Sequence, residues 1–184
     1  VRDALAVLTR EVCEAAGVPR SQVREVLVVG NTAMHHLLAD LPVRQLGMAP
    51  YRPALTTALE LSAQALGLDV APGARVHLPP VVAGFVGSDH VAMLLGTGLD
   101  RRAGTVLAVD IGTNTEMTLL HEGRLRSCSS PSGPAFEGAH LSTGMRAAPG
   151  AVEAVRIRGA TVHVRTIDDA PPIGICGSGI LDLM

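Results

Sequence analysis

The sequence TVLAVDIGTNTEMTLLHEGR, residues 105–124, is the stretch that decides how this chain folds. The apolar run at 106–109 predicts a buried strand, and a second predicted strand covers 116–120. Between them, Asp110 and the segment 111–115 form a tight turn. Such a loop offers backbone N–H groups, hydroxyls and a carboxylate, which are the groups that hold a polyphosphate and its magnesium ion. We therefore expect the loop to bind a nucleotide.

An ordinary hairpin is the alternative, because Asp, Gly, Asn and Thr are all common in turns. In a binding site, Gly112 would let the backbone approach the phosphates, since a side chain there would stand in the way. The Asp-x-Gly-Thr turn between two strands resembles the phosphate loops of the superfamily of acetate and sugar kinases, heat-shock chaperones and actin. In those proteins the turn faces the nucleotide across a cleft.

A second glycine-rich segment, GICGSG at 174–179, precedes the apolar residues of 180–184. The pattern predicts a turn that opens an amphipathic helix, and the positive end of a helix attracts an anion. Close packing of a strand against a helix explains these glycines equally well. The segment is no Walker loop, because no Gly-Lys-Ser/Thr follows, and it is no dinucleotide fingerprint.

Several motifs taken together are more specific than any one of them. The segments DIGTNTE at 110–116, SGPAFEGA at 132–139 and GICGSG at 174–179 resemble the reductive activators of corrinoid proteins. The amino-terminal segments VVGNTAMHHLL at 28–38 and PPVVAGFVGSD at 79–89 resemble the same family in the same order. The resemblance runs from about residue 10 to the end of the chain.

The resemblance implies an activity, because members of that family use ATP to drive the one-electron reduction of a corrinoid from Co(II) to Co(I). It implies ATP and Mg²⁺ as cofactors, and a corrinoid protein or a corrinoid-dependent methyltransferase as the partner. It also allows a homodimer. In that family, electrons come from a [2Fe–2S] ferredoxin-like domain, which needs four thiolates. This chain has only Cys13, Cys128 and Cys176, so we expect the cluster in an N-terminal region outside these residues.

Roles for individual residues follow from their positions in the matched motifs. Asp110 is expected to hold magnesium through water or to orient the attacking water, and with Glu116 it is a candidate catalytic residue. Glu116 serves equally well as a hydrogen-bonded strand residue. The residues expected to bind the nucleotide are Gly112, Thr113, Asn114, Thr115, Glu137, Gly174, Gly177, Ser178 and Gly179.

The expected architecture is α/β, with ribonuclease-H-like lobes of the actin and sugar-kinase type, truncated at both ends. We expect residues 1–104 to complete the first lobe with a connecting helix, and residues 105–184 to form the second lobe. Such ATPases carry a first phosphate loop near the start of lobe one, and this chain has no second Asp-x-Gly-Thr. Gly30-Asn31-Thr32 is the nearest equivalent and lacks the carboxylate.

The charge and composition of the chain limit the classes of partner that we expect. A net charge of −2 and a pI near 6.4 give no electrostatic reason to expect nucleic acid or an anionic membrane surface. No apolar run reaches the ~18 residues of a membrane span, and no signal peptide is evident, so we expect a cytoplasmic protein. Aromatic residues are limited to Tyr51, Phe85 and Phe136, which predicts an aliphatic core.

Local patterns predict further elements. Apolar spacing predicts a helix over 3–16, closed by Gly17, and favours a helix over 55–68. Ser88 is expected to cap a helix that runs to about residue 95. Residues 152–167 predict a hairpin that turns at Gly159-Ala160.

Two other functions remain open at this point. One is a small-molecule kinase of the same superfamily, which would need a substrate base and a sugar or acyl pocket. The other is a non-catalytic module that responds to nucleotide, which stays possible because the first phosphate loop is absent.

Overall fold

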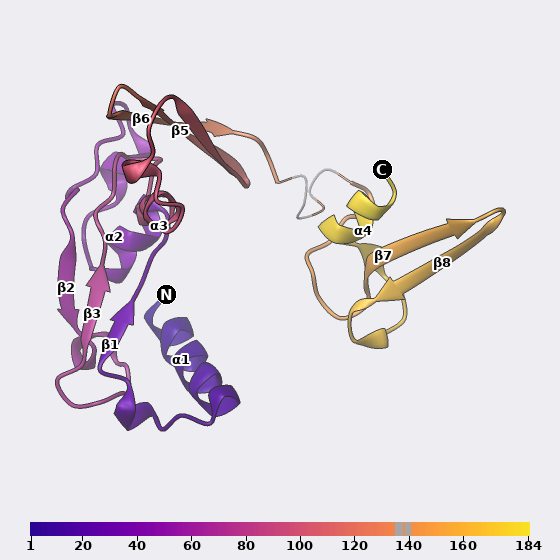
Figure 1. Ribbon diagram of the computed structural model, residues 1–184. Coiled ribbons are helices and arrows are strands. Elements are labelled where there is room, and N and C mark those ends of the chain that lie inside the picture. The colour runs from indigo at the N-terminus through magenta and orange to yellow at the C-terminus, as the bar shows by residue number, and fades with distance from the viewer. Residues whose placement is uncertain (135–137, 139–140) are drawn as a thin grey trace. The chain divides into compact units, whose positions relative to one another are not determined.

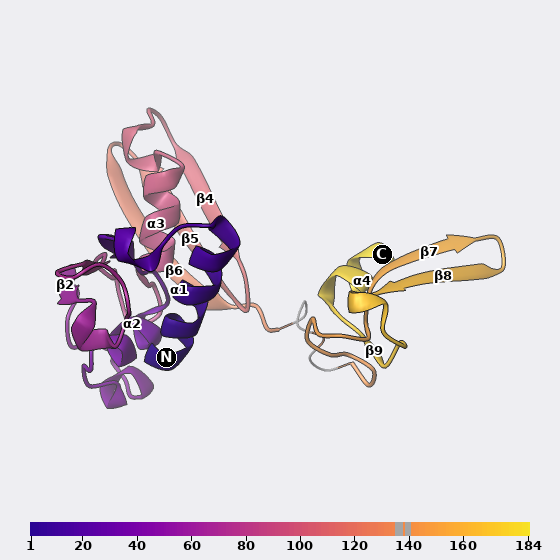
Figure 2. The same cartoon turned by 90° about the horizontal axis from the view of Figure 1, so that it is seen from below.

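The computed structural model describes most of the chain, namely residues 1–134, 138 and 141–184. These residues divide into two compact units (Figures 1 and 2). The first unit comprises residues 1–110 and 116–129, and the second comprises residues 111–115 and 130–184. Each unit contains both strands and helices, which confirms the predicted α/β class.

Helix α1 (Arg2–Ala16) opens the first unit, as the apolar spacing predicts. The helix ends because Gly17 adopts the left-handed conformation, with φ of 65°, and donates its N–H to the carbonyl of Glu14 at 3.1 Å. Glycine has no β-carbon and accepts this conformation without steric cost, which is why it commonly follows the last turn of a helix.

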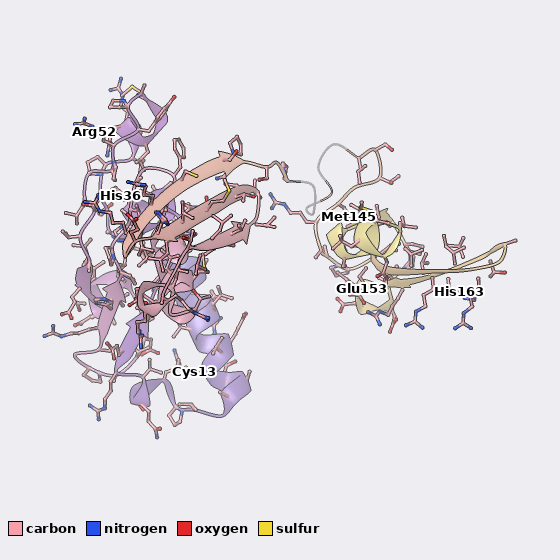
Figure 3. The ribbon with its side chains drawn as sticks, turned by 45° about the horizontal axis from the view of Figure 1, so that its top comes forward. Cys13, His36, Arg52, Met145, Glu153 and His163 are labelled. Atoms are coloured by element: carbon pink, nitrogen blue, oxygen red, sulfur yellow. The ribbon has the colours of Figure 1, made fainter. Side chains whose placement is uncertain are left out.

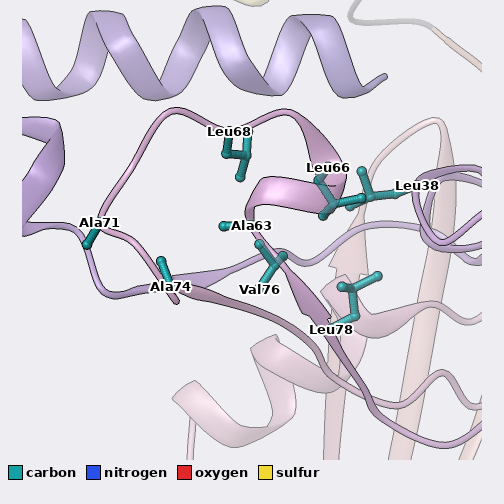
Figure 4. Close-up of a cluster of buried hydrophobic side chains, with 8 residues drawn as sticks. All are labelled: Leu38, Ala63, Leu66, Leu68, Ala71, Ala74, Val76 and Leu78. Atoms are coloured by element: carbon teal, nitrogen blue, oxygen red, sulfur yellow. The ribbon is translucent and has the colours of Figure 1, made fainter.

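The main core of the first unit lies against a three-stranded sheet. Strands β1 (Glu25–Leu27), β2 (Leu59–Ser62) and β3 (Arg75–Leu78) follow the order β1–β3–β2. β3 pairs in parallel with β1 and antiparallel with β2. The eight buried residues of this core, drawn in Figure 4, are Leu38, Ala63, Leu66, Leu68, Ala71, Ala74, Val76 and Leu78. All are aliphatic, as the composition predicts.

The helix predicted over residues 55–68 is wrong. The segment instead contains strand β2 and the single 3₁₀ turn η3 (Gln64–Leu66). Leu59 and Leu61 are partly buried and pack on the core, whereas the residues between and after them are exposed. This alternation has the period of a strand, and pairing with β3 satisfies the backbone groups that a helix would have bonded internally.

Helix α2 (Thr32–Leu38) places two adjacent histidines in the interior. Asn31 caps the helix, its side-chain oxygen accepting the N–H of Met34 at 2.9 Å. His35 and His36 are 3% and 0% exposed, with ring centroids 5.4 Å apart. The Nε2 atom of His36 accepts the backbone N–H of Ala54 at 3.0 Å, which ties the following irregular segment to the helix.

The buried His35 makes stability depend on pH. Burial lowers the pKa of His35 from its usual value of 6.5, and the neighbouring His36 lowers it further. Between the folded-state pKa and 6.5, the unfolded chain binds more protons than the folded chain. The contribution of His35 is therefore complete above pH 6.5, and the free energy of unfolding falls as the pH drops below it, by up to ~1.4 kcal/mol per pH unit.

Urea denaturation at about pH 7.5 and about pH 5.5 measures this dependence. A His35→Gln protein should lose less stability between the two pH values than the unsubstituted protein. The exposed His163 provides the matched control, and His163→Gln should leave the difference unchanged. Equal pH dependence in all three proteins would contradict the prediction.

Helix α3 (Ser88–Gly96) begins differently from the prediction. Gly87 occupies the capping position, and no side chain caps the helix, so the assignment of Ser88 as the cap is wrong. The buried Ser88 hydroxyl instead accepts the N–H of Gly30 and donates to its carbonyl, both at 3.1 Å. Gly87 allows this close contact, because a β-carbon there would lie 2.5 Å from the Gly30 carbonyl oxygen.

A second sheet follows α3 in the order β4–β5–β6 and includes the sequence quoted first. It consists of β4 (Val106–Ile111), β5 (Asn114–His121) and β6 (Arg124–Pro131). Leu94 and Leu99 pack with Leu120 of β5 in a small buried cluster, against which Val106 and Ala108 of β4 also pack.

The second unit contains a third sheet in the order β8–β7–β9. Strands β7 (Ala151–Arg158) and β8 (Thr161–Thr166) form the predicted hairpin. The short strand β9 (Gly174–Ile175) runs parallel to β7 and leads into helix α4 (Gly177–Asp182). Across the residues that the structure describes, no helix combines the length and apolarity needed to cross a membrane.

Candidate functional site: the β4–β5 hairpin and the glycine-rich segment

The predicted loop is a tighter hairpin than the sequence suggests. β4 extends to Ile111 and β5 begins at Asn114, so only Gly112 and Thr113 lie outside the strands. Asp110 is therefore the penultimate residue of β4. The N–H of Gly112 donates to the carbonyl of Asn114 at 2.9 Å and is not free for a phosphate. This corrects the expectation of a longer turn with open backbone donors.

The burial pattern of β4 and β5 indicates that the two candidate carboxylates lie on one face of the sheet. In β4 the residues alternate, and Val106, Ala108 and Asp110 are all partly buried. In β5, Glu116 has the same parity as Leu120, which packs with Val106 and Ala108. Since alternate residues of a strand share a face, Asp110 and Glu116 lie on the face that packs on α3.

The two carboxylates have different partners. Glu116 accepts a hydrogen bond from the Ser129 hydroxyl of β6 at 2.9 Å, so it is fixed in place. This is the hydrogen-bonded strand residue that sequence analysis held open as an alternative. Among the residues that the structure describes, none forms a hydrogen bond or ion pair with the side chain of Asp110. Within the described residues, the Asp110 carboxylate is therefore the less constrained of the two.

The residues that follow β6 form hydrogen bonds with the hairpin turn. The N–H groups of Ser132 and Gly133 both donate to the carbonyl of Thr113, at 3.0 and 2.9 Å. The hydroxyls of Thr115 and Ser132 are hydrogen-bonded at 2.5 Å. Thr113, Thr115 and the start of the SGPAFEGA segment are therefore brought together, although Ser132 lies 17 positions after Thr115 in the sequence.

A buried hydrogen-bond chain links the same strand to α3, and sequence analysis missed it. His90 of α3 is 1% exposed, and its Nε2 lies 2.6 Å from the hydroxyl of Thr118, which is fully buried. Thr118 in turn contacts the Ser127 hydroxyl at 2.6 Å. Thr118 lies two residues beyond Glu116, and Ser127 lies two residues before Ser129. The chain therefore fixes β5 and β6 relative to each other and to α3 beside the candidate carboxylate.

Packing accounts for two glycines of the glycine-rich segment. A β-carbon on Gly179 would lie 2.3 Å from the carbonyl oxygen of Val152 in β7. One on Gly174 would lie 2.7 Å from the sulfur of Met145 and 2.8 Å from the carbonyl oxygen of Thr143. The alternative of close strand–helix packing therefore applies to Gly179 of α4, whereas Gly174 of β9 packs against the segment 143–145.

The rest of the segment differs in exposure. Cys176 and Gly177 are buried, and the Cys176 thiol donates to the Val152 carbonyl at 3.3 Å. Ser178 is exposed, and its hydroxyl lies 3.4 Å from the Cys176 sulfur. Of the four residues predicted to bind nucleotide here, Ser178 presents the accessible polar group. Glu137, the remaining predicted residue, lies outside the described residues.

Together, these elements define a class of protein. An α/β frame with an Asp-x-Gly-Thr hairpin is typical of the acetate and sugar kinase, heat-shock chaperone and actin class, abbreviated ASKHA. Residues 104–184 match the family model described as the C-terminal domain of RACo, the ASKHA domain. Residues 1–102 match the model described as the RACo middle region. The chain belongs to the RACo family, which confirms the resemblance to the reductive activators.

Named relatives agree with this assignment. The corrinoid activation enzyme RamQ of Eubacterium limosum is 34% identical over 182 residues, which cover 99% of this chain and 30% of RamQ. A Co(II) methylated amine-specific corrinoid protein reductase of Methanosarcina barkeri is 35% identical over 94 residues, which cover 51% of this chain and 17% of that protein.

The fold is also found among solved structures. A reductive activator for corrinoid, iron-sulfur protein matches with a TM-score of 0.82 and 37% identity. The match covers 100% of this chain and 30% of the activator. The chain thus spans less than a third of the length of RamQ and of this activator.

Proposed function

We propose that this protein is the ATP-dependent part of an activator that returns a corrinoid protein from the Co(II) to the Co(I) state. The observation that carries the proposal is the match to a reductive activator over the whole chain, with a TM-score of 0.82 and 37% identity. RamQ and the Methanosarcina reductase support it, because both are named for action on corrinoids or corrinoid proteins.

The hairpin fits a magnesium nucleotide. Asp110 supplies a carboxylate that forms no hydrogen bond or ion pair with the described residues, and Mg²⁺ is commonly held by one or two carboxylates together with waters and phosphate oxygens. Within the described part of the chain, no group of three or more His, Cys, Asp or Glu side chains is placed to hold a metal ion. A single carboxylate that shares the ion with the phosphates agrees with that finding.

The proposed roles of the hairpin residues follow from their positions. Asp110 would hold the magnesium ion through water, and Glu116, fixed by Ser129, would orient the attacking water. Since the Gly112 N–H is occupied, we assign the phosphate contacts to the Thr113, Asn114 and Thr115 side chains, with Gly112 permitting their approach. We further propose that residues 105–184 form the lobe that carries these contacts, with Ser178 contributing to the nucleotide site.

The proposed reaction needs a source of electrons. Co(II) gains one electron to become Co(I), a donor loses one electron, and the hydrolysis of ATP to ADP and phosphate drives the transfer. We assign the donor to a [2Fe–2S] domain beyond these residues, because Cys13 and Cys176 are buried and Cys128 is the one exposed thiol of the chain. Four thiolates would be required for a cluster.

The test is a reduction assay without oxygen on the protein at the length that its gene encodes. A corrinoid methyl-transfer protein from the same organism, in the Co(II) state, is mixed with the protein, a titanium(III) reductant and MgATP. We expect the Co(II) electron paramagnetic resonance signal to disappear at least tenfold faster with MgATP than with a non-hydrolysable ATP analogue.

Two results would contradict the proposal. One is a rate of Co(II) loss that does not depend on ATP, although ATP binds. The other is transfer of the γ-phosphate to a small molecule, which would identify the protein as a kinase of the same class.

A further inference from the structure

The first unit contains a cleft that the proposed function does not use. Its volume is about 360 Å³, and it is lined by the segments 50–53 and 82–86 and by residues 127–129 of β6. All of these residues belong to the same compact unit. The volume lies within the range of about 300 to 1,000 Å³ that small-molecule sites commonly occupy.

An exposed aromatic pair forms one wall of the cleft. Tyr51 and Phe85 have ring centroids 5.2 Å apart and planes tilted by 55°. Their exposed fractions are 43% and 52%, in a chain with one tyrosine, two phenylalanines and no tryptophan. A composition so poor in aromatic residues makes the concentration of two rings at one cleft informative, because exposed ring faces stack on planar ligands.

The backbone around the rings is held in place. Tyr51 has a φ of 58°, in the left-handed region that bulky residues rarely adopt, and its N–H donates to the Met48 carbonyl at 2.7 Å. A β-carbon on Gly84 would lie 2.1 Å from the Tyr51 carbonyl oxygen, so glycine is required there. The buried Thr32 hydroxyl donates to the Ala83 carbonyl at 2.6 Å. Strained backbone that is fixed by its surroundings is typical of ligand sites.

A positive charge lies beside the rings. Arg52, labelled in Figure 3, is exposed and also lines the cleft. Among the residues that the structure describes, none forms a hydrogen bond or ion pair with its guanidinium. Guanidinium groups bind carboxylate and phosphate groups through paired hydrogen bonds and also stack on aromatic rings.

We propose that this cleft binds a planar aromatic or heteroaromatic ring that carries a carboxylate or phosphate group. The ring stacks on Tyr51 and Phe85, and the anionic group pairs with Arg52. Probe binding is measured without ATP, so this proposal and the proposed function can fail separately.

The test uses 2-naphthoate as the probe, 2-naphthyl phosphate to compare the two anionic groups, and neutral 2-naphthamide as the matched control. Tyrosine labelled with carbon-13 reports on the cleft by nuclear magnetic resonance, and a Tyr51→Phe protein assigns the Tyr51 signals. We expect at least one anionic probe to shift these signals with a dissociation constant of about 1 mM or lower, and 2-naphthamide to bind at least fivefold more weakly.

Substitutions at exposed positions identify the groups that bind. Arg52→Gln should weaken binding of the anionic probe at least fivefold and leave 2-naphthamide unaffected. Arg44→Gln, which changes an exposed arginine outside the cleft, should have no effect. Phe85→Leu should weaken all probes. Failure of both anionic probes to bind, or equal affinity for the neutral probe, would overturn the proposal. An Arg52→Gln protein that binds as well as the Arg44→Gln protein would do so too.

Discussion

An Asp110→Asn protein should bind MgATP at least tenfold more weakly than the unsubstituted protein, a difference of ~1.4 kcal/mol. The substitution keeps the size of the side chain but removes the negative charge that we assign to the magnesium ion. Without metal, the effect of the substitution on ATP affinity should disappear or reverse. In the presence of a chelator, the substituted protein should bind ATP as tightly or more tightly, because the carboxylate repels the phosphates.

Isothermal titration calorimetry with magnesium and with chelator measures both effects. Asp69→Asn is the matched control, since Asp69 is an exposed aspartate paired with Arg20 and lies outside the hairpin. Equal weakening with and without magnesium would show that Asp110 acts on the shape of the hairpin. No change in either condition would place the phosphates elsewhere in the protein.

A Gly179→Ala protein should be destabilised by about 3 kcal/mol, at the upper end of the cost of overpacking a core. The new β-carbon would stand 2.3 Å from the Val152 carbonyl oxygen and 2.9 Å from the Ile175 side chain. Because the Val152 carbonyl also accepts hydrogen bonds from Cys176, neither α4 nor β7 can move away without breaking the contact between them.

Urea denaturation monitored by circular dichroism measures the loss. Gly96→Ala at the end of α3 is the control, because a β-carbon there meets nothing within 4 Å. We expect that substitution to be neutral or to stabilise by up to about 1 kcal/mol. Similar stability of the two variants would show that α4 moves readily away from β7. Close packing would then not explain why position 179 is glycine.

Local patterns predicted the elements that sequence neighbours determine. The helix at 3–16, the strands around Asp110 and the hairpin that turns at residues 159–160 each appear near the predicted positions. The segment 55–68 was predicted wrongly because its strand has only four residues, too few to show a period clearly. Pairing with β3, which is distant in the sequence, decides its structure.

The candidate site, like the fold, was predictable only where it depends on residues that are neighbours in the sequence. The polar residues of the hairpin are adjacent in the sequence, so a motif reveals them. His90 and Thr118 are 28 residues apart, and each alone resembles an ordinary helix or strand residue. Only the folded chain shows that they meet. The tightness of the turn, which occupies the Gly112 N–H, also depends on strand pairing that composition does not specify.

Ser129 belongs to two environments, since it lines the cleft beside Tyr51 and donates its hydroxyl to Glu116. A ligand in the cleft that accepts this hydroxyl would release the carboxylate, and a nucleotide that moves Glu116 would free the hydroxyl. The two occupancies would then be thermodynamically linked. Each ligand would change the affinity of the other by the same factor, so that a small molecule in the cleft would raise or lower the affinity of the protein for its nucleotide.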